Sequence, residues 1–284
     1  MKVLVQNYSS PLTTEPLYLT ECMKRIGIES SLWADNNVAT FDIFDTYKPD
    51  VFISNFAFLT EDIIKYLSQN NSIKMLLNVT GTSKDHLAMI LQTLDAKNIK
   101  NYHLFTNNFR HPHGDSVEKI LPCCDVFISC PPPQFKIPLA VVTNDKNEKV
   151  EGFIDDKEVY HLVSYGKKEE WSDYTTDIRS FWGLAKCYDE VKLIDDGLIS
   201  TSQFFFQATM LCNKFSIMSQ SNDQRDAFEE ILSELFTPEE TSESVESIVK
   251  KQISKNHTCF NRTSQVLKML GMEEKSKELL EILG

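Results

Sequence analysis

The sequence predicts an α/β protein with two Rossmann-like domains facing across a cleft and helices at its C-terminal end. Short apolar runs alternate with amphipathic stretches in both halves, which is typical of parallel strands joined by crossover helices. A segment with three successive prolines, residues 130–138 (CPPPQFKIP), stiffens the chain between the halves. The length of 284 residues suits two modest domains. We therefore expect an N-terminal domain over residues 1–134 and a C-terminal domain over residues 135–284.

The elements of the N-terminal half follow from this alternation. Apolar runs predict strands at residues 2–6, 30–34, 51–55, 74–79, 102–106 and 126–129. Apolar residues at helical spacing predict helices at residues 14–26, 41–47, 61–68 and 83–94. Glu15-Pro16 suits a helix start, and Thr60 is placed to cap the third helix.

The second half repeats the pattern after the prolines. We expect strands at residues 139–143, 159–164, 190–194 and 215–219, and helices within 171–187 and at 203–211 and 226–235. Three further helices, at residues 245–253, 263–270 and 274–282, finish the chain. In such sheets ligands bind beyond the carboxyl ends of the strands, so the loops after the strands are the candidate sites.

Composition and charge exclude several function classes. The net charge of −12 argues against binding to a nucleic-acid backbone or to an anionic membrane surface. The start, MKVLVQNYSS, predicts no signal peptide, and no apolar run reaches the length of a membrane span. The seven cysteines are odd in number and scattered, which predicts reduced thiols and a cytoplasmic protein.

The absence of phosphate-binding and metal-binding motifs disfavours further classes of enzyme. The chain has nine glycines and no glycine-rich phosphate loop, which disfavours a standard dinucleotide site and a P-loop kinase. No DxD motif occurs in the chain, and the aspartate pair Asp195-Asp196 lacks the spacing residue of that motif. This absence disfavours metal-dependent sugar transfer. His111-Pro112-His113 lacks a second ligand cluster, so no metal and no other cofactor is expected.

Three segments of the second half resemble, in order, the CgeB-like (spore maturation protein type) group of glycosyltransferases. The segment 160–197 is similar to that family's strand–loop–helix–strand, in which a helix ending in a tyrosine is followed by an acidic pair and a strand. Residues 198–217 (LISTSQFFFQATMLCNKFSI) resemble its glutamate–alanine helix and following strand, and residues 257–271 (HTCFNRTSQVLKMLG) its terminal helix. The chain departs from the family pattern at two positions, with Gln207 in place of the carboxylate and Asn213 in place of the glycine.

The resemblance implies a GT-B fold in which the C-terminal domain holds a nucleotide-sugar. The family carboxylate binds the donor's ribose hydroxyls, and the matching Gln207 can still hydrogen-bond them. On this basis we expect donor binding by six residues, Ser164, Gly166, Lys167, Ser202, Gln203 and Gln207. Lys167 or Lys168 would neutralise the diphosphate leaving group, and the start of the helix at 203–211 would offer free N–H groups to a phosphate. An exposed turn and a solvated helix edge are the alternative interpretations of these residues.

The N-terminal domain is expected to hold the acceptor. A transfer with inversion needs a base near the acceptor hydroxyl, and His111, His113 and Asp115 are the candidates, with Asp85 and His86 as a second option. The hydroxyl-rich loop after the first strand and the loop after the fourth suggest acceptor binding by Asn7, Ser9 and Thr82. The loop after the first strand can equally be a simple connection in which Thr14 caps the next helix.

Three functions stay open at this stage. The first is a metal-independent glycosyltransferase that moves a sugar from a nucleotide-sugar to an unidentified acceptor. The second is a catalytically silent module of the same fold that binds a nucleotide-sugar or a protein partner, as the glutamine at position 207 and the scarcity of glycine suggest. The third is a sugar-binding protein of the periplasmic kind, which the absence of a predicted signal peptide disfavours.

Overall fold

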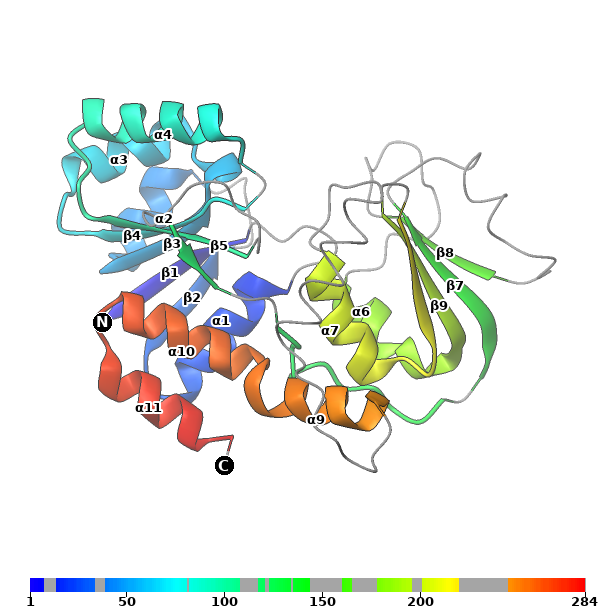
Figure 1. Cartoon of the computed structure of the whole chain (residues 1–284). Coiled ribbons are helices and arrows are strands. Elements are labelled where there is room, and N and C mark those ends of the chain that lie inside the picture. Colours follow the sequence, from blue (N-terminus) through cyan, green and yellow to red (C-terminus); the bar gives the residue numbers. More distant parts are fainter. Residues whose placement is uncertain are drawn as a thin grey trace. The chain divides into compact units, whose positions relative to one another are not determined.

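The chain, described from a computed structural model, is an α/β protein with two parallel sheets (Figure 1). The structure describes residues 1–7, 14–33, 39–80, 82–107, 117–120, 123–133, 135–143, 160–164, 178–195, 201–219 and 245–283. The predicted fold class is confirmed: strands and helices alternate, every paired strand is parallel, and helices close the chain. The predicted helix at residues 226–235 lies outside the described part.

The chain forms two compact units that do not coincide with the predicted domains. Unit 1 comprises Met1–Ser9, Glu15–Leu121 and Cys259–Gly284, and unit 2 comprises Ser10–Thr14 and Pro122–Thr258. The division therefore falls near residue 121 rather than 134, and the last two helices belong to unit 1 rather than to the C-terminal domain. Their packing gives the reason: Lys275 Nζ donates to the carbonyl oxygen of Ile26 at 2.7 Å, and Lys74 Nζ to that of Leu270 at 3.5 Å.

Unit 1 is built on a six-stranded sheet with the strand order β2-β1-β3-β4-β5-β6. Its strands are β1 (Lys2–Gln6), β2 (Glu29–Trp33), β3 (Val51–Asn55), β4 (Lys74–Asn78), β5 (Tyr102–Thr106) and the short β6 (Glu118–Lys119). Its helices are α1 (Glu15–Arg25), α2 (Thr40–Tyr47), α3 (Glu61–Gln69), α4 (Lys84–Ala96), α10 (Cys259–Met269) and α11 (Glu273–Glu281), with the 3-10 helix η1 (Phe56–Phe58) after β3. The order of the first five strands is that of a doubly wound sheet.

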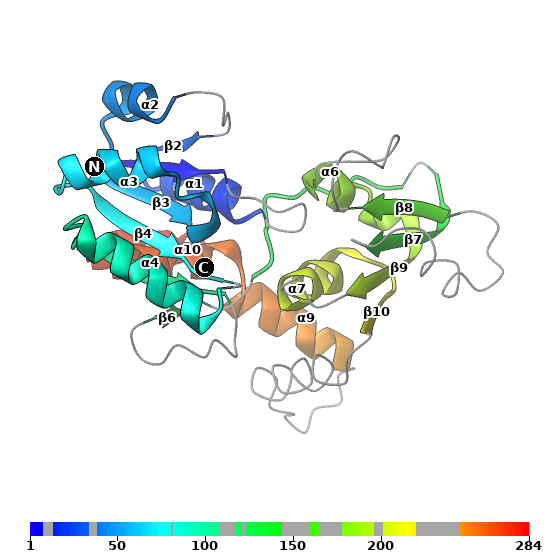
Figure 2. The same ribbon diagram turned by 90° about the horizontal axis from the view of Figure 1, so that it is seen from above.

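Helices cover both faces of this sheet. Figures 1 and 2 show α3 and α4 on one face and α1 and α10 on the other. Side chains from β1, β3 and β4 such as Leu4, Phe52 and Leu77 are fully buried in the core under α2, α3 and α4. Because successive strand residues point to opposite faces, Val3 and Val5 face the other side, and both are fully buried as well. The two-faced burial explains why the strands read as continuous apolar runs.

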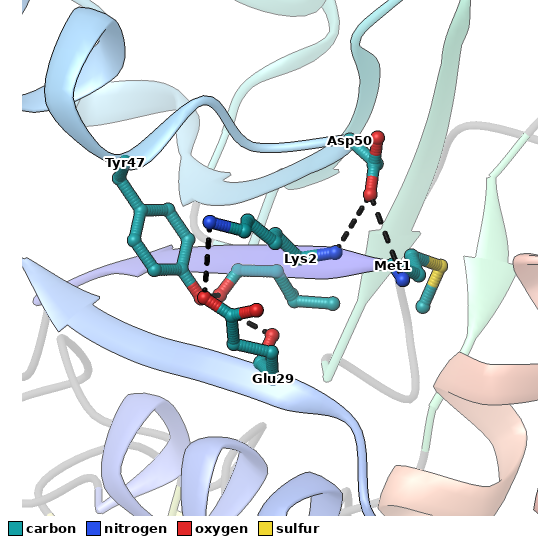
Figure 3. Close-up of polar contacts among 6 residues, drawn as sticks. Met1, Lys2, Glu29, Tyr47 and Asp50 are labelled. Atoms are coloured by element: carbon teal, nitrogen blue, oxygen red, sulfur yellow. Dashed lines mark hydrogen bonds and ion pairs between the residues drawn. The ribbon is translucent and has the colours of Figure 1, made fainter.

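Charged groups and a tyrosine connect the amino ends of the strands in this sheet, which we call its amino edge (Figure 3). The Lys2 backbone N–H donates to Asp50 Oδ2 at 2.7 Å, and Lys2 Nζ lies 3.2 Å from Glu29 Oε1. The hydroxyl of Tyr47 donates to the carbonyl oxygens of Glu29 at 3.1 Å and Val3 at 3.3 Å. Burial, followed by the nearby carboxylates of Glu29 and Asp50, raises the pKa of Tyr47 to about 12. The polar groups at this edge therefore interact with one another within unit 1.

Unit 2 contains a four-stranded sheet with the order β10-β9-β7-β8. Its elements are β7 (Ile137–Thr143), β8 (Tyr160–Ser164), α6 (Ile178–Gly183), the 3-10 helix η4 (Ala185–Cys187), β9 (Tyr188–Asp195), α7 (Thr201–Leu211), β10 (Phe215–Ser219) and α9 (Val245–Asn256). In chain order its strands are arranged 4-3-1-2, which matches β2-β1-β3-β4 of unit 1 read from the other side. Each unit thus contains the point at which successive connections leave a central strand in opposite directions.

Two cores hold the described part of unit 2 together. Phe181, Trp182 and Tyr188 pack on the sheet with α7, while Phe206 joins Cys124 and Ile253 in a smaller cluster. The rings of Phe206 and His257 are stacked with centroids 5.1 Å apart. His257, which precedes α10, is buried and its carbonyl oxygen accepts from the Cys124 backbone N–H at 2.8 Å.

Two local predictions differ from the structure. Residues 126–129, expected as a strand, form no strand: residues 126 and 127 make a turn, in which Asp125 Oδ1 accepts from the Phe127 backbone N–H at 3.0 Å, and the Val126 side chain remains 44% exposed. The strand expected to begin at Leu139 begins at Ile137 and includes Pro138. Pairing with β8 starts only at Leu139, so the missing N–H of this proline is tolerated.

Candidate functional site

Amide and hydroxyl side chains gather at the carboxyl ends of the strands in unit 1. Gln6 ends β1 and Asn7 follows it, and Ser54 and Asn55 are the last two residues of β3. Asn78 ends β4 with Thr80 just beyond it, and Thr106 ends β5 with Asn107 just beyond it. We call this set the carboxyl edge. Open α/β sheets bind their ligands beyond this edge, where side chains of neighbouring strands converge. The carboxyl edge of unit 1 is therefore the candidate functional site.

The carboxyl edge is joined across the two central strands. Ser54 Oγ on β3 donates to Gln6 Oε1 on β1 at 2.6 Å, and both side chains are buried. These strands are adjacent in the sheet but separated by β2 in the chain. The bond therefore lies where the connections diverge, which is the usual position of a ligand crevice in this architecture.

A buried carboxylate stands at the centre of the neighbouring polar network. Glu15 is the first residue of α1 and only 1% exposed. Its Oε2 accepts from Asn78 Nδ2 at 2.8 Å and from Asn107 Nδ2 at 3.2 Å. Burying a carboxylate is costly unless hydrogen bonds compensate it, and these two amides supply them from the ends of two adjacent strands.

The chemistry of the carboxylate fixes how both amides are turned. An ionised carboxylate only accepts hydrogen bonds, so each asparagine must present its nitrogen to Glu15. Asn78 Oδ1 then accepts from the Thr80 backbone N–H at 2.9 Å. Asn107 is held from a second side, because its backbone N–H donates to Thr80 Oγ1 at 2.8 Å. Asn107 Oδ1 is left buried without a hydrogen-bond partner among the described residues.

The predicted acceptor residues fall at or near this edge. Asn7 follows β1 and its backbone N–H donates to the Trp33 carbonyl oxygen at 2.9 Å. Thr82 follows β4, but its side chain is buried and its hydroxyl donates to the Val79 carbonyl oxygen at 2.6 Å. Ser9 lies outside the described residues. The structure therefore brings Asn7 and Thr82 to the predicted edge, and their binding of an acceptor stays a prediction.

The second option for the base, Asp85 and His86, lies in the exposed first turn of α4. Ser83 caps this helix by accepting from the His86 backbone N–H at 3.2 Å. The His86 ring meets that of Phe56 edge to face, with centroids 5.5 Å apart. Because Phe56 follows β3, the His86 ring lies beside the end of that strand. His111, His113 and Asp115, the first choice for the base, lie outside the described residues.

The predicted donor residues belong to unit 2, and Gln207 is the one whose side chain is described. It is 4% exposed; its Oε1 accepts from the Asp125 backbone N–H at 2.7 Å, and its Nε2 donates to the Asp125 carbonyl oxygen at 3.4 Å. The amide thus holds both ends of one residue's backbone. A donor-binding role for Gln207 stays a prediction, and it must coexist with this structural one.

For three of the other predicted donor residues the structure describes only the position in a strand or helix, and two lie outside the described residues. Ser164 ends β8, and Ser202 and Gln203 lie in the first turn of α7. Gly166 and Lys167 are outside the described residues. The helix α7 is the element that follows β9 in the chain, and phosphate binding by its first turn stays a prediction.

Two further properties concern the described residues alone. No group of three or more His, Cys, Asp or Glu side chains among them is arranged to hold a metal ion. No helix in the described ranges is long and apolar enough to cross a membrane.

The sequence interpretation missed Glu15, Asn78 and Asn107 as site residues. Glu15 was assigned only a place at a helix start, although a glutamate in the first turn after a hydroxyl-rich loop is compatible with either role. A signal was present in the chain, since an asparagine ends or follows four strands of the unit 1 sheet, at positions 7, 55, 78 and 107. This repeat marks one edge of a parallel sheet.

The chain is similar in fold to several solved structures. No family model matches it, and no curated protein matches its sequence. The spinosyn forosaminyltransferase SpnP is 11% identical with a TM-score of 0.43, covering 100% of this chain and 94% of its own. The glycosyltransferase SnogD from Streptomyces nogalater is 10% identical with a TM-score of 0.47, covering 94% and 98%. The S. aureus MnaA–UDP structure is 9% identical with a TM-score of 0.46, covering 95% and 97%.

Proposed function

We propose that this chain is a glycosyltransferase that moves a sugar from a nucleotide-sugar donor to an acceptor without a metal ion. The observation that carries the proposal is that one chain contains two parallel sheets of matching strand order, each with its own carboxyl edge. Open α/β sheets bind ligands beyond their carboxyl edges, so each of the two sheets can hold one of the two substrates. The resemblance of residues 160–217 to sugar transferases favours unit 2 for the donor, which leaves unit 1 for the acceptor.

The reaction assigns distinct tasks to the two edges. The acceptor hydroxyl gives its proton to a base, its oxygen forms a bond to the anomeric carbon, and the bond from that carbon to the diphosphate breaks. The leaving diphosphate gains negative charge, which Lys167 and the first turn of α7 with Ser202 and Gln203 would stabilise. His111, His113 or Asp115 would take the proton. Ser164 and Gly166 would approach the donor after β8.

A thermal-shift panel with UDP, GDP, CMP, dTDP and their sugars tests the donor assignment. One nucleotide series should raise the melting temperature in a saturable manner. Lys167→Ala should weaken that shift, while Lys251→Ala, an exposed position on α9, should leave it unchanged. Silence from every nucleotide, or equal weakening by both lysine variants, would refute the assignment.

The second candidate is a module that binds a nucleotide-sugar or a protein partner without catalysis. The engagement of Gln207 with the Asp125 backbone favours it, because this amide stands where the family that residues 198–217 resemble has a carboxylate. A saturable thermal shift without any release of nucleoside diphosphate from the sugar would support the module over the enzyme.

A further inference from the structure

The buried amide oxygen of Asn107 at the carboxyl edge points to the chemical class of the ligand in unit 1. Asn107 is 9% exposed, and its Oδ1 has no hydrogen-bond partner among the described residues. An unsatisfied buried carbonyl costs about 1–3 kcal/mol. Such a group is rare in native proteins and marks a place where a hydrogen-bond donor is missing.

The orientation of this oxygen is set by its surroundings. Asn107 cannot turn its amide over, since its oxygen would then face the Glu15 carboxylate, to which Nδ2 now donates at 3.2 Å. Its backbone N–H is held by Thr80 Oγ1 at 2.8 Å. Glu15 thus acts as a positioning residue that keeps Asn107 as an acceptor toward any ligand.

The available chemistry decides between ligand classes. A phosphate or a carboxylate brings mainly acceptors and a negative charge to an oxygen that needs a donor, and an ionised Glu15 nearby would repel it. An ammonium group would have to give up its water to reach the uncharged amide oxygen of Asn107. A hydroxyl satisfies Asn107 Oδ1 by donating, and it can still accept from a neighbouring group.

We propose that the carboxyl edge of unit 1 binds a neutral polyhydroxylated molecule, a sugar or a sugar alcohol, and that Asn107 accepts a hydrogen bond from one of its hydroxyls. That this molecule is the acceptor of the sugar transfer rests on the proposed function; its binding does not.

The test is a titration followed by the side-chain amide signals of Asn78 and Asn107 in two-dimensional ¹H–¹⁵N spectra. The probes are methyl α-D-glucopyranoside, methyl α-D-mannopyranoside and sorbitol, with inorganic phosphate and ammonium chloride as the competing classes. At least one neutral probe should shift both amide signals saturably, and the two ions should not. These signals locate the binding in the wild-type chain, so the result does not depend on a variant that folds.

Variants sharpen the assignment. Asn107→Leu should weaken the binding of the active probe about tenfold or more, as loss of one buried hydrogen bond implies. The control is Asn101→Leu, which changes the same residue type just before the same strand, β5, at the amino edge, and it should bind like the wild type. In Glu15→Gln the Asn107 amide is free to turn, so polyol binding should fall and phosphate should begin to shift the Asn78 signal.

The outcomes separate this inference from the proposed function. No saturable shift by any neutral probe, or a shift by phosphate or ammonium in the wild type, overturns the inference even if nucleotide-sugars are consumed. A polyol shift in a chain that ignores every nucleotide sustains the inference and overturns the transferase.

Discussion

Gln207 on α7 holds Asp125 by both polar groups of its backbone. The glutamine Oε1 accepts from the Asp125 N–H at 2.7 Å, and Nε2 donates to the Asp125 carbonyl oxygen at 3.4 Å. Both residues are buried and lie 82 positions apart in the chain. A residue with one donor and one acceptor is needed for this pairing, which a carboxylate cannot supply.

The first prediction follows from this requirement. Gln207→Glu should lower the free energy of unfolding by about 1–3 kcal/mol, because the carboxylate would face the Asp125 carbonyl oxygen without a hydrogen to share. Urea denaturation measures the change. The same substitution at Gln252 on α9 is the control, since Gln252 Oε1 only accepts from Asn256 Nδ2 and a glutamate can do the same. Equal stability of both variants would show that the Asp125 pairing contributes nothing.

A second prediction concerns the buried glutamate. Glu15→Ala should destabilise the chain by about 2–4 kcal/mol, because the amides of Asn78 and Asn107 lose their charged partner and stay buried. Glu61→Ala provides the comparison: Glu61 is also in the first turn of a helix but is exposed, and its loss should cost only a few tenths of a kcal/mol. Chemical denaturation of the two variants decides, and a small effect at Glu15 would contradict the network.

Alkaline pH should weaken the folded state through Tyr47. Burial and the carboxylates of Glu29 and Asp50 raise the pKa of this tyrosine to about 12, above the value near 10 of an unfolded chain. Between these two pH values the folded state binds more protons than the unfolded one, so stability falls as pH rises through this window. Far-UV circular dichroism during urea unfolding at several pH values follows the decline.

The variant Tyr47→Phe isolates this contribution. It removes the ionisable group together with the hydroxyl's bonds to the carbonyl oxygens of Val3 and Glu29. It should therefore be less stable than the wild type at pH 8 and should lose less stability between pH 10 and 12. If the free energy of unfolding falls equally in the two proteins between pH 10 and 12, Tyr47 does not cause the loss of stability.

Thiol reactivity should distinguish Cys130 from the other cysteines. All seven are free thiols; Cys130 is half-buried and the other six are buried. Burial raises the pKa of the Cys130 thiol, whose Sγ–H also donates to the Trp182 carbonyl oxygen. Limited alkylation of the native protein at pH 8 should modify Cys130 first, though slowly, as peptide mass spectrometry would show. Faster labelling of Cys212, which is buried with its pKa raised to about 12, would contradict the packing of unit 2.

The sequence predicted the elements well where local pattern decides. The strands expected at residues 2–6, 51–55 and 102–106 have those bounds in the structure, because buried parallel strands are short apolar runs with clear ends. Residues 126–129 carry the same kind of run, but the Asp125 side chain turns the chain there. Strand β6 has two residues and no detectable pattern.

Contacts between residues far apart in the chain could not be predicted from the local sequence pattern. The helices α10 and α11 belong to unit 1 through contacts such as Lys275 with Ile26, 249 positions apart, and no local pattern encodes such a partner. The same applies to the site. The sequence places Asn7 and Thr82 at the strand ends because they follow strands, and their role stays a prediction. The meeting of Glu15, Asn78 and Asn107 depends on strand order and on the direction in which α1 begins.

Donor consumption tests the central proposal most directly. The purified chain would be incubated with each UDP-, GDP-, CMP- and dTDP-sugar, with and without the polyol that shifts the Asn107 amide signal, and the released nucleoside phosphate measured by chromatography. The account predicts release from one nucleotide series, faster with the polyol present and reduced by Lys167→Ala. Intact donors in every reaction, under conditions in which the chain is folded, would contradict a glycosyltransferase.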